Sequence, residues 1–119
     1  MTDYKQGDVI LVSFNPESGN HGNREIDVKK RPALVLSSLA HNQATGELVI
    51  AQITSRTLPQ TQSGDYKIEQ WQESNLPGPA RVRCRLATIP SSWVVSKLGE
   101  MADPDLHGVK QALSEALPG

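Results

Sequence analysis

The most informative segment of the chain is Lys29-Lys30-Arg31-Pro32-Ala33-Leu34-Val35-Leu36-Ser37-Ser38. Pro32 fixes its own φ and disfavours a helical Arg31, and the apolar run Ala33–Leu36 is too short for a helix, so the segment predicts a buried strand. Arg31 then stands at the mouth of a stiff element, where its guanidinium can meet a phosphate through two parallel hydrogen bonds. The segment alone leaves a second interpretation open, in which Arg31 only marks the solvated end of the strand.

The length and charge of the chain limit its class. Its 119 residues predict a single domain, residues 1–119, with one hydrophobic core. The formal net charge is -1, but residues 100–119 hold four acidic and one basic side chain, which leaves eleven basic and nine acidic ones in residues 1–99. A local basic face can therefore exist without a global positive field.

Cysteine usage and hydropathy indicate the compartment. Cys84 is the only cysteine, so no intrachain disulfide forms and a reducing compartment fits. No signal segment is visible at the N-terminus and no apolar run approaches about 18 residues. We expect a cytoplasmic protein that does not act at a membrane.

Short apolar runs between turn residues predict a mainly β fold. The five predicted strands lie at residues 9–14, 33–37, 48–54, 65–70 and 81–89. Between them, residues 17–30 and 55–64 are predicted as long loops, and residues 39–46 as a connector that turns at Thr45-Gly46. Ser91 or Ser92 can cap a short helical turn through residues 93–95.

A C-terminal helix is predicted to begin at Asp103-Pro104-Asp105, because aspartate and proline favour the first turn. Its apolar face consists of Leu106, Val109, Leu113 and Leu117. Strands and helices do not alternate, so the pattern favours a small antiparallel barrel with the C-terminal helix packed on it.

The predicted strand at residues 81–89 alternates two kinds of side chain. One face carries Val82, Cys84 and Leu86, and the other carries Arg81, Arg83 and Arg85. Three guanidiniums on one strand face repel one another and require an anionic partner. Carboxylates elsewhere in the fold and an external polyanion such as RNA are both compatible with the row.

Metal sites and activated nucleophiles are not indicated by the sequence. His21, His41 and His107 are far apart, and no His or Cys pair has ligand spacing. Cys84 is predicted as a small core residue, and neither a phosphate-binding Walker loop nor a GxSxG elbow occurs. We therefore expect no metal and no cofactor.

Two hydroxyls and a guanidinium, Thr54-Ser55-Arg56, stand at the end of the third predicted strand, where it meets solvent. Read alone, they fit either a functional site or a strand cap with a loop.

Several motifs together resemble the MazF/PemK family of toxin endoribonucleases. They are Gly7-Asp8-Val9 before a strand that ends Phe14-Asn15-Pro16, then Arg31–Ser37, then Ile50–Ser55, and finally Val82–Ile89. The resemblance extends from about Tyr4 to Leu117, and the order of the pieces makes it specific. It implies an SH3-like barrel of the CcdB/PemK kind and a homodimer that serves as the toxin of a type II toxin–antitoxin system.

The resemblance also implies a chemistry. Members cleave single-stranded RNA, such as mRNA, at short sequences without a metal, and a cognate antitoxin protein blocks the RNA groove. The catalytic pair implied here is Arg31 and Thr54. The further RNA-binding residues that we expect are Lys29, Lys30, Ser55, Arg56, Arg81, Arg83 and Arg85.

The chemistry agrees with these residue types. RNA supplies its own nucleophile, the 2′-hydroxyl, so cleavage would leave a 2′,3′-cyclic phosphate and a 5′-hydroxyl. Arg31 suits charge stabilisation on the phosphorane, whereas a guanidinium is a poor general base, and the base remains unassigned.

The chain departs from the family pattern in two places. Its first loop is longer, with Arg24–Lys30 added, and reads Glu17-Ser18-Gly19-Asn20 instead of a Gly-Ser-Glu-Gln run. Arg85 stands where many relatives carry a polar uncharged residue.

Two alternatives use the same barrel without cleavage. A gyrase poison of the CcdB type acts through residues near its C-terminus, typically including a tryptophan, whereas this chain ends in Ala116-Leu117-Pro118-Gly119 and carries Trp71 and Trp93 earlier. The other alternative is a family member that only binds RNA or an antitoxin.

Overall fold

A computed structural model describes residues 3–13, 30–55 and 63–117 of the chain. Its strands are β1 (Asp8–Ser13), β2 (Lys30–Val35), β3 (Glu47–Thr54), β4 (Tyr66–Lys67), β5 (Arg81–Pro90) and β6 (Val94–Glu100). Its helices are α1 (Leu39–Thr45), α2 (Asp103–Ala116) and the two short 3-10 helices η2 (Trp71–Ser74) and η3 (Ser91–Trp93). No helix in these ranges has the length and apolar character needed to cross a bilayer.

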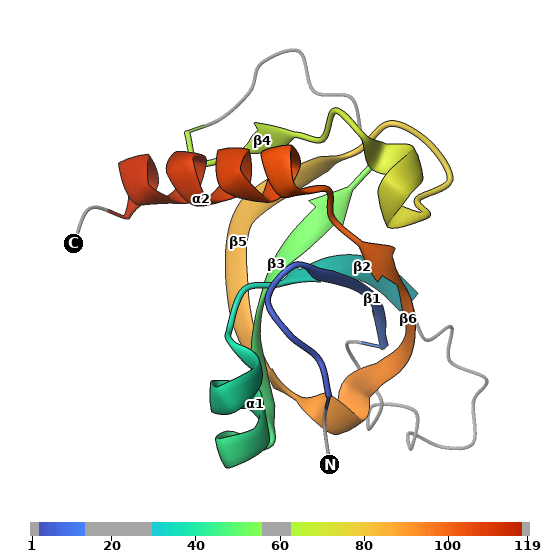
Figure 1. Cartoon of the computed structure of the whole chain (residues 1–119), viewed down its shortest axis with the longest axis vertical. Coiled ribbons are helices and arrows are strands. Elements are labelled where there is room, and N and C mark those ends of the chain that lie inside the picture. The colour runs from blue at the N-terminus through green and yellow to red at the C-terminus, as the bar shows by residue number, and fades with distance from the viewer. Residues whose placement is uncertain (1–2, 14–29, 56–62, 118–119) are drawn as a thin grey trace, which may run out of the picture.

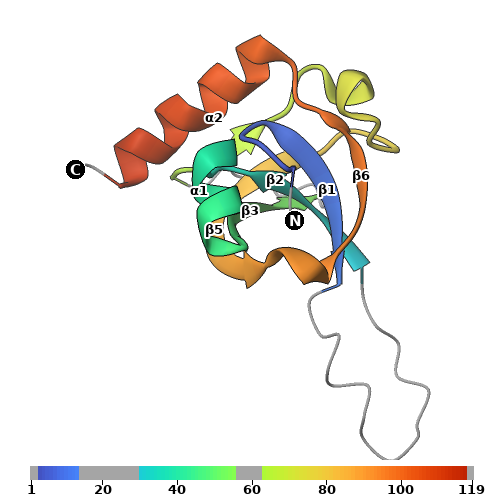
Figure 2. The same ribbon diagram turned by 60° about the horizontal axis from the view of Figure 1, so that its bottom comes forward.

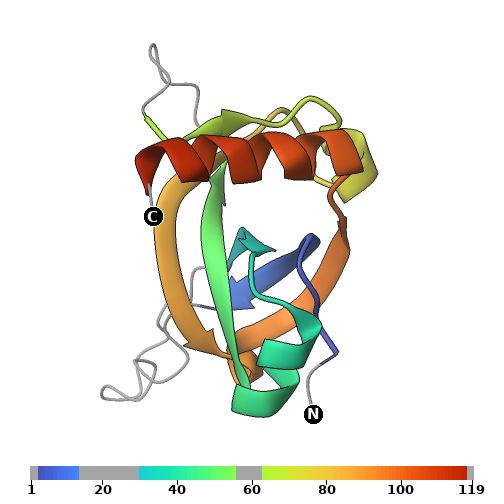
Figure 3. The same ribbon diagram turned by 60° about the vertical axis from the view of Figure 1, so that its left-hand side comes forward.

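The strands form one antiparallel sheet in the order β4-β5-β3-β2-β1-β6. The sheet curls strongly, with α2 lying across one end of β3 and β5 and α1 beside the other end of β3 (Figures 1 and 3). In the described part of the chain the end strands β4 and β6 are not paired with each other, so the sheet is barrel-like but open. The prediction of a mainly β fold with a C-terminal helix is confirmed.

Alternation along the strands divides the core into two clusters, one on each face of the sheet. The cluster under α2 contains Val9, Leu34, Ala51, Ile53, Val82 and Val109. The cluster enclosed by the curl contains Ile10, Val12, Ala33, Val35, Leu48, Ile50 and Ile89. Strands β1, β2 and β3 are therefore buried on both faces, which explains their continuous apolar runs.

Helix α2 is anchored through Asp105, which is 1% exposed. Its carboxylate accepts hydrogen bonds from the Tyr66 hydroxyl at 2.6 Å and from the backbone N–H groups of Glu69 at 3.0 Å and Gln70 at 2.8 Å. Burial of the phenol, together with this hydrogen bond, raises the pKa of Tyr66 to about 12. The Tyr66 ring lies against Gly108, where a Cβ atom would overlap it. Asp105 thus ties α2 to the segment after β4.

Strand β1 is held to β6 by charge as well as by backbone pairing. Asp8, which is buried, forms ion pairs with the ammonium groups of Lys5 at 3.2 Å and Lys97 at 3.3 Å. Hydrogen bonds to Asp8 and Glu100 raise the pKa of both lysines, and the two lysines lower the pKa of Glu100. Figure 2 shows β6 running beside β1.

Four elements differ from the sequence prediction. Residues 39–46 form helix α1 instead of a connector, because the Ser38 side chain accepts from the His41 N–H at 3.1 Å and Gly46 ends the helix with a φ of 73°. Residues 94–100 form a sixth strand, so the predicted helical turn is limited to η3. The strand predicted at 65–70 is reduced to β4, because the backbone of Glu69 and Gln70 turns to meet Asp105. Leu117, predicted on the apolar face of the helix, lies beyond α2 and is 55% exposed.

Candidate functional site

Pro32 creates an opening between β2 and β3. Strand β2 begins at Lys30, three residues earlier than predicted, and pairs with β1 along its length. Its ladder with β3 covers only Ala33 to Val35, since Pro32 has no N–H to offer. Beyond that point the two strands are no longer bridged, and side chains on both can border a pocket.

The first pocket lies at this opening and has a volume of about 540 Å³. Its strand side consists of Lys30, Arg31, Pro32, Ile53, Thr54 and Ser55, and its other wall is Leu76, Pro77, Gly78 and Ala80. The pocket therefore brings together the two motifs that the sequence analysis placed on separate strands. Its wall from Leu76 to Ala80 contains Pro77 and Pro79, which favour irregular structure, and the sequence does not show which strand end such a segment covers.

Arg31, Thr54 and Arg81 fall in one row across three adjacent strands. Continuing the Ala33–Gln52 register by two residues places Arg31 opposite Thr54, and Thr54 pairs with Arg81 on β5. Side chains directly opposite one another on neighbouring strands project from the same face. The threonine is thus flanked by two arginines.

Arg81 is a buried cation without a counter-ion among the described residues. It is 9% exposed, its Nη1 atom is enclosed, and no hydrogen bond or ion pair reaches it from that part of the chain. A charge taken out of water without a partner is costly, so Arg81 would be stabilised by an anion at the row.

Arg83 differs from Arg81 because it has an internal partner. Its Nε atom lies 3.3 Å from an Asp65 oxygen, and the other Asp65 oxygen accepts from the Cys84 N–H at 2.9 Å. For this arginine, a carboxylate within the fold supplies the anionic partner.

A bulge breaks the alternation that the sequence analysis assumed for β5. Ile53 pairs with Val82 and Ala51 with Leu86, so three β5 residues lie opposite the single residue Gln52. The prediction that Leu86 faces inward is wrong, since Leu86 is 40% exposed. The prediction that Arg81 shares an outer face with Arg83 and Arg85 is also wrong, because Arg81 is buried, whereas Val82 faces the core as predicted.

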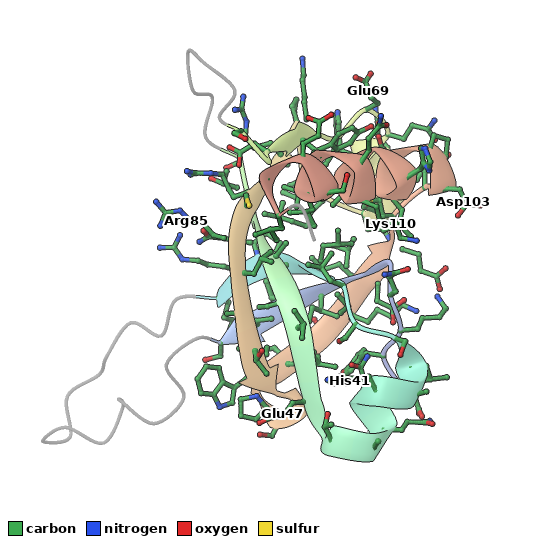
Figure 4. The ribbon with its side chains drawn as sticks, turned by 90° about the vertical axis from the view of Figure 1, so that its left-hand side faces the viewer. His41, Glu47, Glu69, Arg85, Asp103 and Lys110 are labelled. Atoms are coloured by element: carbon green, nitrogen blue, oxygen red, sulfur yellow. The ribbon has the colours of Figure 1, made fainter. Side chains whose placement is uncertain are left out.

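A second pocket of about 280 Å³ adjoins the first. It is lined by Arg31, Ile50, Gln52, Arg85, Leu86 and Ala87. Arg85 is exposed and projects away from β5 (Figure 4). Arg31 lines both pockets and therefore stands between them, and none of the described residues that line either pocket is acidic.

The predicted site residues are thus only partly brought together. Arg31, Thr54, Lys30 and Ser55 line the first pocket, Arg81 extends their row, and Arg85 borders the second pocket. Lys29, Arg56 and the first loop up to Lys29 lie outside the described residues. Within the described ranges, no three His, Cys, Asp or Glu side chains are grouped so as to hold a metal ion. Gln52 was not singled out from the sequence, since a glutamine in a strand gives no signal until its pocket is seen.

Comparison with known proteins gives a consistent family. A family model described as "PemK-like, MazF-like toxin of type II toxin-antitoxin system" matches residues 5–117. Among solved structures, the chain resembles MazF from Deinococcus radiodurans with a TM-score of 0.72, 22% identity and 100% of each chain covered. It resembles an endoribonuclease from Mycobacterial species with a TM-score of 0.72 and 19% identity, over 98% of this chain and 93% of that chain.

A third similar structure is an endoribonuclease in complex with its cognate antitoxin, also from Mycobacterial species. Its TM-score is 0.71 at 20% identity, over 96% of this chain and 94% of that chain. Identities this low show a shared fold, and no curated protein matched the chain.

Proposed function

The chain belongs to the PemK-like, MazF-like toxins of type II toxin–antitoxin systems, and we propose on that basis that it is an endoribonuclease that cleaves single-stranded RNA at specific sequences without a metal. The observation that carries this proposal is that Arg31 and Thr54 line the same pocket, where the ladder between β2 and β3 has ended. An exposed guanidinium and a hydroxyl on adjacent strands can hold one phosphate between them.

The proposed reaction uses the RNA's own 2′-hydroxyl. Its oxygen forms a bond to phosphorus, the bond from phosphorus to the 5′-oxygen breaks, and the products are a 2′,3′-cyclic phosphate and a 5′-hydroxyl. The attacking oxygen is already adjacent to the phosphate, so proximity is supplied by the substrate. The proton lost by the 2′-hydroxyl goes to an unassigned base, and the departing 5′-oxygen takes up a proton from water.

Arg31 and Thr54 would act on the charge that develops in this step. The Arg31 guanidinium can donate to a non-bridging oxygen and to the leaving 5′-oxygen, and the Thr54 hydroxyl can donate to the other non-bridging oxygen. Removing one such donor typically costs about 10² to 10³ in rate.

Further basic side chains, together with the Ser55 hydroxyl, would hold the RNA on either side of the cleaved phosphate. Arg81 is the strongest candidate, because a phosphate at the row would supply the counter-ion that the described part of the chain does not give its buried guanidinium. Lys30, Ser55 and Arg85 border the pockets, and Lys29 and Arg56 adjoin them in sequence. Arg83 is the weakest candidate, since Asp65 already neutralises it.

The partners proposed are single-stranded RNA, a cognate antitoxin and a second copy of the chain in the cytoplasm. Family membership supports the antitoxin, and one similar solved structure is an endoribonuclease bound to its cognate antitoxin.

The decisive assay incubates the purified protein with a long RNA in excess EDTA and maps the cuts by primer extension. We expect cleavage at a limited set of sites, with 2′,3′-cyclic phosphate ends. A substrate with one 2′-deoxy nucleotide at the scissile position should not be cut.

Two outcomes would contradict the proposal. Cutting of the deoxy substrate, or a requirement for Mg²⁺ after chelation, would show that the nucleophile is not the 2′-hydroxyl. No cutting of any RNA, together with cleaved DNA trapped on gyrase, would favour a gyrase poison.

A further inference from the structure

The second pocket contains an unexplained polar residue. Gln52 lies on the central strand β3 between buried neighbours, Ala51 and Ile53, and its side chain makes no hydrogen bond to another residue in the described part of the chain. The bulge of β5 lies directly opposite it, which widens the space over its side chain. The amide therefore borders a pocket of about 280 Å³ with its donor and acceptor available.

The other residues of this pocket suit an aromatic, anionic ligand. Arg85 is exposed, has no ion-pair partner in the described chain and offers a flat guanidinium. Leu86 adds an apolar surface that is 40% exposed, contrary to the alternation of its strand. Single-stranded RNA is recognised by such groups, with bases stacked on guanidinium planes or apolar side chains and their edges bound by amides.

We propose that the second pocket binds the base of a nucleotide next to the scissile phosphate, with Gln52 contacting the base edge and Arg85 stacking on its face. This inference rests on the proposed ribonuclease function. Arg31 lines both pockets, so a base in the second pocket adjoins a phosphate held at Arg31 and Thr54. The amide can rotate to present its donor and acceptor in either order, so the structure assigns a position of the RNA sequence and leaves the identity of the base to experiment.

The test is a cleavage-site profile on an RNA pool randomised around the cut. Gln52→Leu removes the amide at nearly constant size, and Gln111→Leu makes the same change at an exposed site on α2 that lines neither pocket. We expect Gln52→Leu to weaken the base preference at one position beside the cut by roughly 5- to 150-fold, the range for one bidentate base contact. Preferences at the other positions, and the profile of Gln111→Leu, should match the wild type.

A second pair of variants checks the two contacts separately. Gln52→Glu keeps the size but replaces the donor with an acceptor, so it should change which base is preferred at that same position. Arg85→Lys keeps the positive charge but removes the planar guanidinium. It should therefore weaken the base preference at that position, while the slope of log RNA affinity against log salt stays constant. Arg85→Ala should weaken the same preference to a similar degree.

The outcomes separate this inference from the function on which it rests. Wild-type cleavage with a profile that Gln52→Leu leaves unchanged would overturn the base-binding pocket alone, even if antitoxin affinity fell. If Gln52→Leu weakened the base preference equally at all positions, that result would also overturn the base-binding pocket alone. Absence of any RNA cleavage by the wild type would overturn both proposals.

Discussion

Pro32 determines the setting of Arg31 in two ways. It keeps the preceding residue extended. It also interrupts the ladder between β2 and β3, so β3 forms no backbone pairing beside Arg31. The guanidinium is therefore exposed while the strand behind it, from Ala33 to Val35, is fully buried.

Replacement of Arg31 should abolish cleavage and leave the fold intact. Arg31→Ala removes an exposed side chain, so the thermal midpoint should stay near that of the wild type while single-turnover cleavage is lost. Thr54→Val removes the hydroxyl at nearly constant shape and should slow cleavage about 10²-fold. Full activity of a folded Arg31→Ala protein would remove Arg31 from the site.

Arg81 and Arg83 should respond in opposite ways to alanine substitution. Arg81→Ala removes a buried cation that has no ion-pair partner among residues 3–13, 30–55 and 63–117, so the free energy of unfolding should stay constant or rise while RNA affinity falls. Arg83→Ala leaves the Asp65 carboxylate buried without its cation and should lower the free energy of unfolding by about 3 kcal/mol. Urea denaturation and filter binding on both variants measure this; a large stability loss in Arg81→Ala would make it a structural residue.

For single residues, the sequence predicted positions at strand ends better than it predicted the burial and ion pairing of each side chain. Arg31 was expected at the start of one strand and Thr54 at the end of the next, and both line the first pocket. The different settings of Arg81 and Arg83 could not be predicted, because the bulge opposite Gln52 depends on how β3 and β5 pair across about 30 intervening residues.

Helix α2 packs closely on β4 at Gly108. Glycine normally weakens a helix, yet here it provides the space that the Tyr66 ring occupies. Asp105 fixes that ring by its hydroxyl, so the ring cannot move aside easily.

Gly108→Ala should therefore destabilise the protein, although the same change stabilises most helices. We expect a loss of about 1–3 kcal/mol in the free energy of unfolding, the usual cost of overpacking. Gly78→Ala is the matched control, because a Cβ atom there would meet nothing within 4 Å. An unchanged or higher urea midpoint for Gly108→Ala would show that α2 does not press on Tyr66.

Alkaline pH should weaken the contact between Tyr66 of β4 and Asp105 of α2 and so lower the free energy of unfolding. An unfolded tyrosine ionises near pH 10, whereas the pKa of Tyr66 in the folded protein is about 12. The folded state therefore holds its proton longer, and its extra stability is complete below pH 10 and lost as the pH rises from 10 to 12.

The change should be about 2–3 kcal/mol and should be measured against Tyr66→Phe. Lys5 and Lys97, whose pKa values are also raised, lose stabilising charge in this range, so the difference between wild type and Tyr66→Phe isolates the phenol. Parallel alkaline curves for the two proteins would contradict the role of Tyr66.

Elements with a regular apolar pattern were predicted, and those set by distant contacts were not. Helix α1 has its caps in the sequence, Ser38 and Gly46, but seven residues are too few to show a helical period. Strand β6 contains Ser96, Lys97 and Gly99, which have little strand propensity, and it forms because β1 has a free edge beside it.

The whole molecule should be a dimer. Family membership motivates this prediction, and Val95 is a large apolar side chain left 48% exposed on β6. Sedimentation at micromolar concentration should give twice the 13.0 kDa mass of one chain. A monomer would also argue against any RNA groove that spans two subunits.

The place of β1 in the sheet has a consequence during protein synthesis. Val9 and Ile10 are fully buried, but β1 completes its pairing only with β6, whose residues 94–100 are translated much later. At about 5–20 residues per second, the nascent chain carries that apolar edge uncovered for roughly 4 to 17 s. Hairpins form within microseconds, so β1 and β2 can pair early. Until β6 is available, the other edge of β1 stays unpaired and can form non-native strand pairs. We therefore expect ribosome-associated chaperones to bind this nascent chain before β6 has emerged.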